Sequence, residues 1–219
     1  MIGGMKNRRK PRQTLLKLAK TGDIQSQYDL VWNFANVKPI DPKQSLKWLK
    51  ISAKNNHIDA ITELGESYLN GNYGSKNKRL GLKWLAISAS QGDMNTQTTL
   101  GVHYFYGDGV KKNRRKAIGL YKKAAKQGCP HANFNLGLSY HYGEGVKKNH
   151  KKSFQHFKAA ALKKHPRSLF WMGECYMDGL GTKKNPKEAT KYFKLAIKLG
   201  DPDAMCCLGV IYHNGYLGK

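Results

Sequence analysis

A pattern of small, leucine, glycine and tyrosine residues returns every 36 residues along this 219-residue chain, and it constrains the fold more than any other feature. The Leu-Gly pair lies at 64–65, 100–101, 136–137 and 208–209, with Met-Gly at 172–173. Tyrosine and glycine follow in the same phase, at Tyr68, Tyr104, Tyr140, Tyr176 and Tyr212 and at Gly71, Gly107, Gly143, Gly179 and Gly215. Such a period is typical of repeat proteins whose units contact only their neighbours.

Each repeat has the pattern of two helices joined by a turn. The small residue, Leu, Gly and Tyr are spaced i, i+4, i+5 and i+8, which places them on one face of a first helix. Glycines after the Tyr predict the end of that helix, and an Asn or Asp in each repeat predicts the N-cap of a second helix. These predicted caps are Asp41, Asn77, Asn113, Asn149 and Asn185. We therefore expect an all-α fold, a right-handed α-solenoid of tandem antiparallel helix pairs.

The glycine in the middle of each first helix is unusual. Glycine at such a position destabilises a helix by about 1 kcal/mol relative to alanine. Its recurrence in the repeats predicts that a neighbouring backbone passes close to this point.

The repeats divide the chain into two parts. Residues 1–12 are expected to form a disordered basic tail, and residues 13–219 a solenoid of about five full repeats plus a terminal half repeat. Thr14–Lys20 resembles the end of a second helix and is expected to cap the solenoid. The last first helix has no second helix after it, so we expect self-association or further pairing through its apolar face. That face comprises Leu208, Val210, Ile211 and Tyr212.

The motif (small)xxxLGxxYxxGxGVxxN(x)7YxKAA, most complete from Thr96 through Ala125, closely resembles the Sel1-like repeat family, a 36-residue relative of tetratricopeptide repeats. The resemblance covers roughly residues 13–219. Departures include Asp29, Val31, and Lys164 where the pattern predicts glycine. The resemblance implies a non-enzymatic scaffold or adaptor that assembles protein complexes. Some bacterial members carry a disulfide in every repeat, and the four cysteines here do not form that framework.

The charge balance is strongly positive, with 39 Lys and Arg against 14 Asp and Glu, a net charge of +25. Such a charge attracts nucleic acid, acidic proteins or anionic membranes, although codon bias in an AT-rich genome is an equal explanation. The basic run at residues 6–12 suits a nuclear address, a nucleic-acid arm or a solvated terminus. No secretory signal and no run of roughly 20 apolar residues is evident. We expect an intracellular, cytoplasmic protein that is not secreted, with a nuclear location as the alternative.

The predicted first helices lack positive charge. The windows 25–36, 59–70, 95–106, 131–142, 168–178 and 203–214 contain none of the 39 Lys and Arg residues. Seven of the 14 acidic residues lie there, namely Asp29, Asp59, Glu63, Glu66, Glu174, Asp178 and Asp203. The basic residues gather in loops and second helices, as at 111–116 and 147–152. We expect a neutral to mildly acidic concave groove, with a basic convex face and edge.

The partner-binding groove is predicted by transferring the inward positions of tetratricopeptide-type first helices from the aligned Leu-Gly pair. These positions are Asn95, Thr98, Val102, Phe105, Tyr106, His131, Phe134, Leu138, His141, Tyr142, Phe170, Glu174, Met177 and Asp178. Rings with polar flanks suit an extended or helical peptide. The alternative for Phe105, Phe134 and Phe170 is that they pack between neighbouring first helices.

The alternative function is a binder of nucleic acid or acidic partners through the basic convex face and the tail. Scarce arginine and the absence of aromatics among the lysine clusters argue against sequence-specific reading. No HExxH, GxSxG or phosphate-binding loop is present, so we expect no enzyme and no cofactor. Cys129, Cys175, Cys206 and Cys207 show no CxxC spacing, and we expect neither a metal site nor a redox motif.

Overall fold

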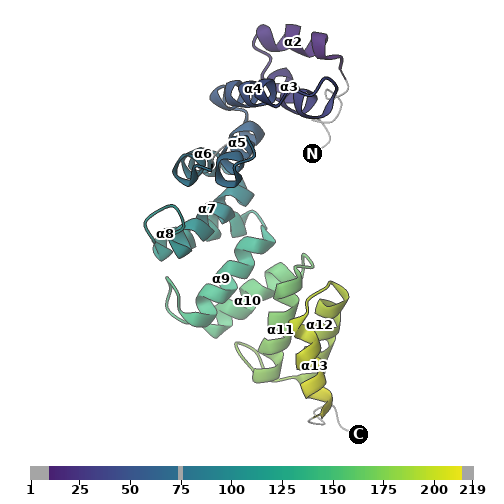
Figure 1. The fold of residues 1–219 in the computed structure, drawn as a ribbon. Coiled ribbons are helices and arrows are strands. Elements are labelled where there is room, and N and C mark those ends of the chain that lie inside the picture. Colours follow the sequence, from purple (N-terminus) through teal and green to yellow (C-terminus); the bar gives the residue numbers. More distant parts are fainter. Residues whose placement is uncertain (1–9, 74–75, 214–219) are drawn as a thin grey trace. The chain divides into compact units, whose positions relative to one another are not determined.

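A computed structural model describes residues 10–73 and 76–213, with the side chain of Tyr212 excepted, and every regular element in these ranges is an α-helix. The helices are α2 (Arg12–Lys20), α3 (Ile24–Asn36), α4 (Pro42–Lys54), α5 (Ile58–Asn70), α6 (Lys78–Ser90), α7 (Met94–Tyr106), α8 (Arg114–Lys126), α9 (Pro130–Tyr142), α10 (His150–Ala161), α11 (Pro166–Asp178), α12 (Pro186–Lys198) and α13 (Asp203–His213) (Figure 1). From α3 on, odd numbers are first helices and even numbers are second helices. The predicted all-α fold of tandem helix pairs is confirmed.

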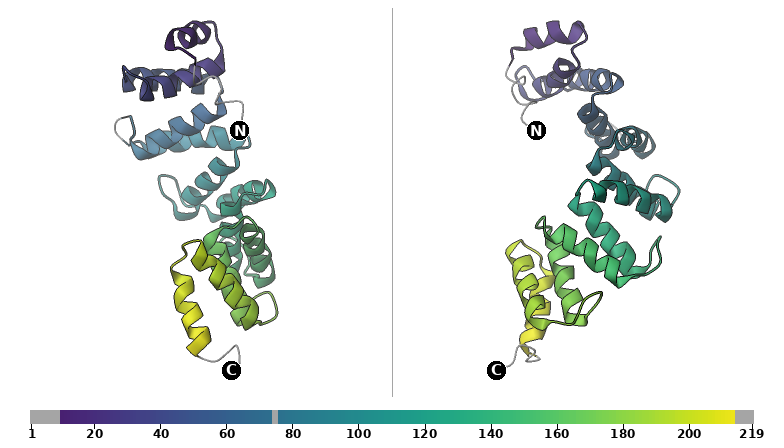
Figure 2. Two further views of the ribbon diagram at one scale, coloured as in Figure 1. Left: turned by 90° about the vertical axis from the view of Figure 1, so that its right-hand side faces the viewer. Right: turned by 180° about the vertical axis from the view of Figure 1, so that it is seen from behind.

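Two compact units make up the chain, residues 1–100 and residues 101–219, and the boundary between them falls within α7. In the first unit α2, α3, α4, α5 and α6 pack in chain order, and in the second unit α8 through α13 do the same. Figure 2 shows this succession from two further sides. Helix α2 begins at Arg12, next to the predicted start of the solenoid, and residues 1–9 of the predicted tail lie outside the described residues.

The predicted N-caps of the second helices are confirmed. In each case the side-chain oxygen accepts a hydrogen bond from the backbone N–H three residues on, as between Asn113 and Lys116 at 2.9 Å. The other four are Asp41, Asn77, Asn149 and Asn185. Such caps contribute about 1 kcal/mol each to helix stability.

In the second unit, the glycine in the middle of the first helix makes room for a side chain rather than for the predicted backbone, whereas a Cβ on Gly65 would also meet the backbone oxygen of Gly81 at 3.1 Å, as predicted. A Cβ atom added to Gly101 would lie 2.5 Å from the ring of Tyr121, and one on Gly173 would lie 2.5 Å from the ring of Phe193. At Gly65 the nearest atom belongs to the Leu85 side chain, at 2.7 Å. The paired second helix thus inserts a large side chain into the first helix, and glycine lets the two helices approach.

The first helices lack Lys and Arg as predicted, with Arg167 as the exception. Helix α11 begins at Pro166, ahead of the predicted window, and therefore includes Arg167 in its first turn. Within the described residues no other first helix contains Lys or Arg. Second helices are lysine-rich, so positive charge is separated from the first helices along the sequence.

Lys164 occupies a turn position that glycine fills in other repeats. Its backbone φ is +56°, and those of the equivalent Gly128 and Gly200 are +84° and +83°. Because left-handed backbone costs a residue with a Cβ about 1–2 kcal/mol, Lys164→Gly is expected to raise the free energy of unfolding by about 1 kcal/mol. Urea denaturation would measure this, with Lys163→Gly, one residue earlier in the same turn, as the control. A higher free energy of unfolding in both variants, or in neither, would contradict the explanation by backbone strain at Lys164.

No helix in the described part of the chain is long and apolar enough to cross a membrane. All four cysteines are free thiols; Cys129 and Cys175 are buried, whereas Cys206 is exposed.

Candidate partner-binding pocket

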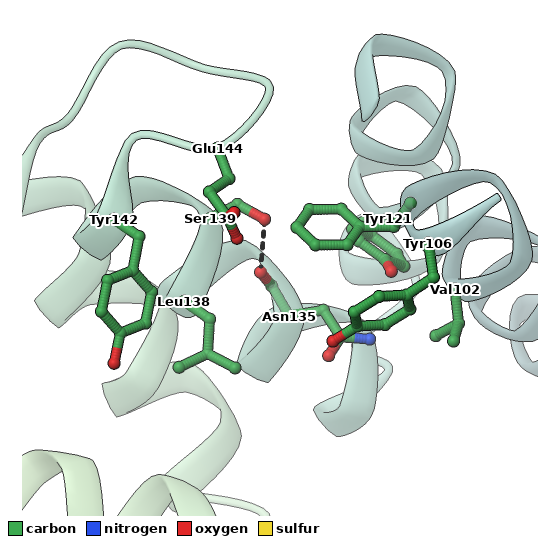
Figure 3. A pocket seen from close by; sticks show the side chains of 9 residues that line it. Val102, Tyr106, Tyr121, Asn135, Leu138, Ser139, Tyr142 and Glu144 are labelled. Carbon is green, nitrogen blue, oxygen red and sulfur yellow. Dashed lines mark hydrogen bonds between the residues drawn. The ribbon is translucent and has the colours of Figure 1, made fainter. Parts of the chain in front are cut away.

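A pocket of about 140 Å³ lies within the second unit, between the C-terminal halves of α7 and α9 (Figure 3). It is lined by Val102, Phe105 and Tyr106 from α7, Tyr121 from α8, Asn135, Leu138, Ser139 and Tyr142 from α9, and Glu144 from the following loop. Apolar cavities of about 150 Å³ are known to bind benzene. The pocket is therefore the size of one aromatic or branched side chain, well below the roughly 300 Å³ that starts the range of small-molecule sites.

Two exposed tyrosines stand at the mouth of the pocket. Tyr106 is 70% exposed and Tyr142 is 57% exposed, and they are the last residues of α7 and α9. Large rings at the surface bind well because they bury much area at a small cost in side-chain entropy. The repeat places the two rings on neighbouring first helices, so both can contact one ligand.

Tyr121 contributes a polar group to the pocket wall. The residue as a whole is 2% exposed, and its hydroxyl makes no hydrogen bond to any described residue. Burial, with a smaller effect of Tyr106, raises the pKa of this phenol well above its ordinary value, so it remains a neutral O–H donor. The equivalent slot in the next two repeats contains Phe157 and Phe193. The hydroxyl is thus not needed to fill the space.

The loop wall of the pocket is fixed by an ion pair. Glu144 accepts from the Arg114 guanidinium at 2.7 Å, and that guanidinium lies 5.2 Å from the ring centre of Phe105. Both charged side chains are about one-third exposed, so the pair adds less than about 1 kcal/mol to stability. Its main effect is positional, because it connects the loop after α9 to the first turn of α8.

The pocket unites five residues of the predicted groove, namely Val102, Phe105, Tyr106, Leu138 and Tyr142. Phe105 is only 8% exposed and belongs to the core, as the packing alternative predicted. Four further lining residues were not among the predicted groove residues, namely Tyr121, Asn135, Ser139 and Glu144. The one available signal was the tyrosine at 121, where the two following repeats have phenylalanine.

His131 and Phe134 lie outside the pocket, in a cluster around His165. The Nε2 atom of His165 is 3.1 Å from Nδ1 of His131, and the Phe134 ring centre is 4.9 Å from that of His165. Phe134 is half-buried and also packs against Phe157 of α10, a second helix, whereas the packing alternative placed it between first helices. This cluster joins two repeats through contacting rings.

The remaining predicted groove residues are dispersed. His141 packs against Trp171, where burial lowers its pKa, and Phe170 packs against Phe193. Met177 adjoins the core formed with α12 and α13, Asp178 is exposed, and burial raises the pKa of the Glu174 carboxyl. In the first unit, Asn95 is exposed and Thr98 is buried.

The family model described as Sel1 repeat matches residues 35–57, 58–93, 97–129, 130–165 and 166–201. The chain belongs to the Sel1 repeat family. No match to a curated protein sequence was found.

Solved structures agree with this assignment. The chain is 28% identical to c5321, a protective antigen present in uropathogenic Escherichia coli strains displaying an SLR fold, with a TM-score of 0.86 over 94% of this chain and 44% of c5321. It is 25% identical to a Sel1 repeat protein from Oxalobacter formigenes, with a TM-score of 0.79 over 95% and 90% of the two chains. Helicobacter pylori cysteine rich protein B shares the fold at 23% identity and a TM-score of 0.51, over 60% and 98%. The chain thus spans less than half the length of c5321.

Neutral histidine caps a first helix in two of these Sel1 repeats, at His57 and His165. Nδ1 of His165 accepts from the backbone N–H of Ser168 at 3.3 Å, so this nitrogen carries no proton. The Nε2–H group then donates to His131. Burial, followed by His131 and Arg167, lowers the pKa of His165 to about 4.

This pKa predicts an acid-sensitive stability. The unfolded chain binds the proton with a pKa near 6.5, so protonation favours unfolding, and the contribution of His165 is complete above pH 6.5 and is lost as the pH falls toward 4. We expect a loss of about 1 kcal/mol between pH 6.5 and 5 that His165→Asn, a cap that does not titrate, removes. Urea midpoints of both proteins across this range would measure it. Identical pH profiles would contradict the role of His165.

Proposed function

We propose that this chain is a protein-interaction scaffold whose second unit binds a protein or peptide by accepting one side chain into the pocket between α7 and α9. Sel1 repeat proteins generally act as protein–protein interaction scaffolds. The observation that carries the proposal is the pair of exposed rings, Tyr106 and Tyr142, at the mouth of a pocket the size of one side chain. Rings around a desolvated pocket are typical of residues that dominate binding energy at interfaces.

Affinity capture with matched variants tests this proposal. Because Tyr106 and Tyr142 are exposed, replacing either by alanine should leave the fold intact and remove captured partners. Leu162→Ala is the control, since Leu162 is a 76% exposed apolar residue that does not line the pocket. Circular dichroism would verify folding. Equal capture by the wild type and all three variants would overturn the proposal.

Phe105 is unsuitable for such a test. It contributes to the core, with its ring 6.4 Å from that of Tyr121, and its removal would destabilise the unit as well as the pocket.

Binding of nucleic acid or acidic partners through lysine-rich segments is a second candidate, favoured by the +25 charge. Described residues of the segments 111–116 and 147–152 are largely exposed. Titration of a DNA duplex at several salt concentrations would test it, because phosphate binding predicts an affinity that falls steeply with salt. An affinity for the duplex that does not change with salt would count against this candidate.

The four free cysteines support an intracellular location for the protein, because disulfides form mainly in oxidising compartments.

Self-association through α13 stays a prediction, with a smaller surface than expected. Ile211 is buried and Leu208 is half-buried, whereas Met205 and Val210 are 62% and 53% exposed. The predicted contribution of Tyr212 lies outside the described side chains. A Cβ on Gly209 would meet nothing within 4 Å, so no side chain of the described residues packs on this glycine as Tyr121 does on Gly101. We expect dimers in sedimentation at high concentration that Val210→Lys removes; a wild-type protein that stays monomeric would refute this.

A further inference from the structure

Resting on the proposed function, we infer that the partner segment is acidic and that it inserts a tyrosine into the pocket between α7 and α9. Two independent properties of the pocket carry this inference. One is a set of polar groups on its walls without hydrogen-bond partners, and the other is the distribution of charge around its mouth.

The polar groups are the hydroxyl of Tyr121 and the side-chain amide of Asn135. Neither makes a hydrogen bond to a described residue, and both residues line the pocket. In Figure 3, Asn135 lies between Leu138 on one side and Tyr106 and Tyr121 on the other. A purely apolar side chain in the pocket would cut such groups off from solvent without offering them hydrogen bonds, which costs binding free energy.

A ring with a polar end avoids this penalty. The pocket volume of about 140 Å³ suits one ring, and a phenol can both donate and accept a hydrogen bond. Sites built around a hydrogen bond discriminate strongly against analogues that lack the polar atom. Tyrosine therefore fits better than phenylalanine or leucine.

Charge around the mouth favours acidic neighbours of this tyrosine. No Lys or Arg lines the pocket, and its single carboxylate, Glu144, is paired with Arg114. Lysines lie just outside. A Cβ on Gly107, next to Tyr106, would be 3.0 Å from Cβ of Lys112, and one on Gly143, next to Tyr142, would be 3.2 Å from Cβ of Lys148.

Lys112 and Lys148 are both exposed, so their ammonium groups are free to contact carboxylates that flank the inserted ring. The net charge of +25 acts in the same direction at longer range, because it attracts an acidic segment and repels a basic one. A neutral pocket with a lysine beside each of its two exposed rings thus recognises an aromatic residue within an acidic stretch.

Short synthetic peptides with a central tyrosine or phenylalanine, flanked by glutamates, glutamines or lysines, are the probes. Fluorescence polarisation with the full chain should show tightest binding for tyrosine between glutamates. The phenylalanine peptide should bind about tenfold more weakly, which corresponds to about 1.4 kcal/mol. The glutamine peptide should also be weaker, and its disadvantage should shrink at high salt.

Two variants separate the two properties. Tyr121→Phe should fold normally, because Phe157 and Phe193 fill the equivalent slot, and it should abolish the preference for tyrosine over phenylalanine. Replacing Lys112 and Lys148 together by glutamine should weaken the glutamate-flanked peptide about tenfold and leave the glutamine-flanked one unchanged. The same change at the exposed Lys187 and Lys198 of α12 is the control.

Equal binding of tyrosine and phenylalanine peptides, or of glutamate-flanked and lysine-flanked peptides, would overturn the inference. So would the absence of saturable binding by every peptide. The proposed function is judged separately by the capture experiment, because partners lost on Tyr142→Ala would still show that the pocket binds protein.

Discussion

Gly181→Ala is expected to lower the free energy of unfolding by about 3–5 kcal/mol, the largest effect predicted for this chain. The loop after α11 passes over the first turn of α10, and Gly181 is the point of contact. A Cβ there would lie 2.6 Å from the carbonyl carbon of His150 and closer still to its oxygen. All the atoms nearest to this Cβ belong to the backbone, so there is no flexible side chain that could move away. The φ of +76° at Gly181 adds backbone strain for alanine.

Gly200→Ala separates these two causes. Gly200 has a φ of +83°, and a Cβ there would meet nothing within 4 Å. This variant should therefore lose only about 1 kcal/mol, from backbone strain alone. Urea midpoints of the two variants, with hydrogen exchange of α10 and α11 amides, would measure the difference. Similar losses in both would mean that the loop does not press on α10.

Gly137→Ala is expected to destabilise the second unit by about 2 kcal/mol, although alanine favours helix. A Cβ at this position would lie 2.5 Å from Cδ1 of Phe157, and the Phe157 side chain is fully buried. The ring cannot swing away because the surrounding core is closely packed. The helix-propensity gain of about 1 kcal/mol is therefore outweighed by the separation of α9 from α10.

Gly119→Ala is the matched control. Gly119 also lies within a helix, α8, but it is exposed and an added Cβ would meet nothing within 4 Å. This change should stabilise the chain by about 0.5–1 kcal/mol. Thermal melts of the two variants should shift in opposite directions. Phe157→Ala removes the ring that the new Cβ would meet, so it should cost less stability in the Gly137→Ala chain than in the wild type; equal costs would contradict the steric explanation.

Sequence reasoning was most successful where structure is local. The caps at Asp41 and Asn113 depend on a side chain and a backbone N–H three residues away, so residue type and spacing suffice to predict them. The same holds for the helix pairs themselves. Helix ends were predicted less well. The window for the first helix at 168–178 omitted Arg167, because a histidine cap such as His165 has no strong sequence signature.

The candidate site was predicted only in part because side-chain exposure depends on neighbouring helices. Phe105 and Tyr106 are adjacent aromatic residues of one helix, yet the first is 8% exposed and the second 70%. Tyr121 belongs to a second helix, which the groove prediction did not consider. Its ring fills the space beside Gly101, and its end reaches the wall of a pocket formed by residues of α7 and α9.

The 36-residue period by itself determined that this chain folds into tandem helix pairs, because periodic apolar faces and caps specify helices from short-range contacts. The positions of Lys and Arg in the sequence likewise predicted first helices without positive charge, with Arg167 as the exception. Tertiary structure alone decided which repeated positions become open and which become core. Packing between successive helices places equivalent residues in different environments, and the pocket lined by α7, α8 and α9 lies where these helices leave the space of one side chain unfilled.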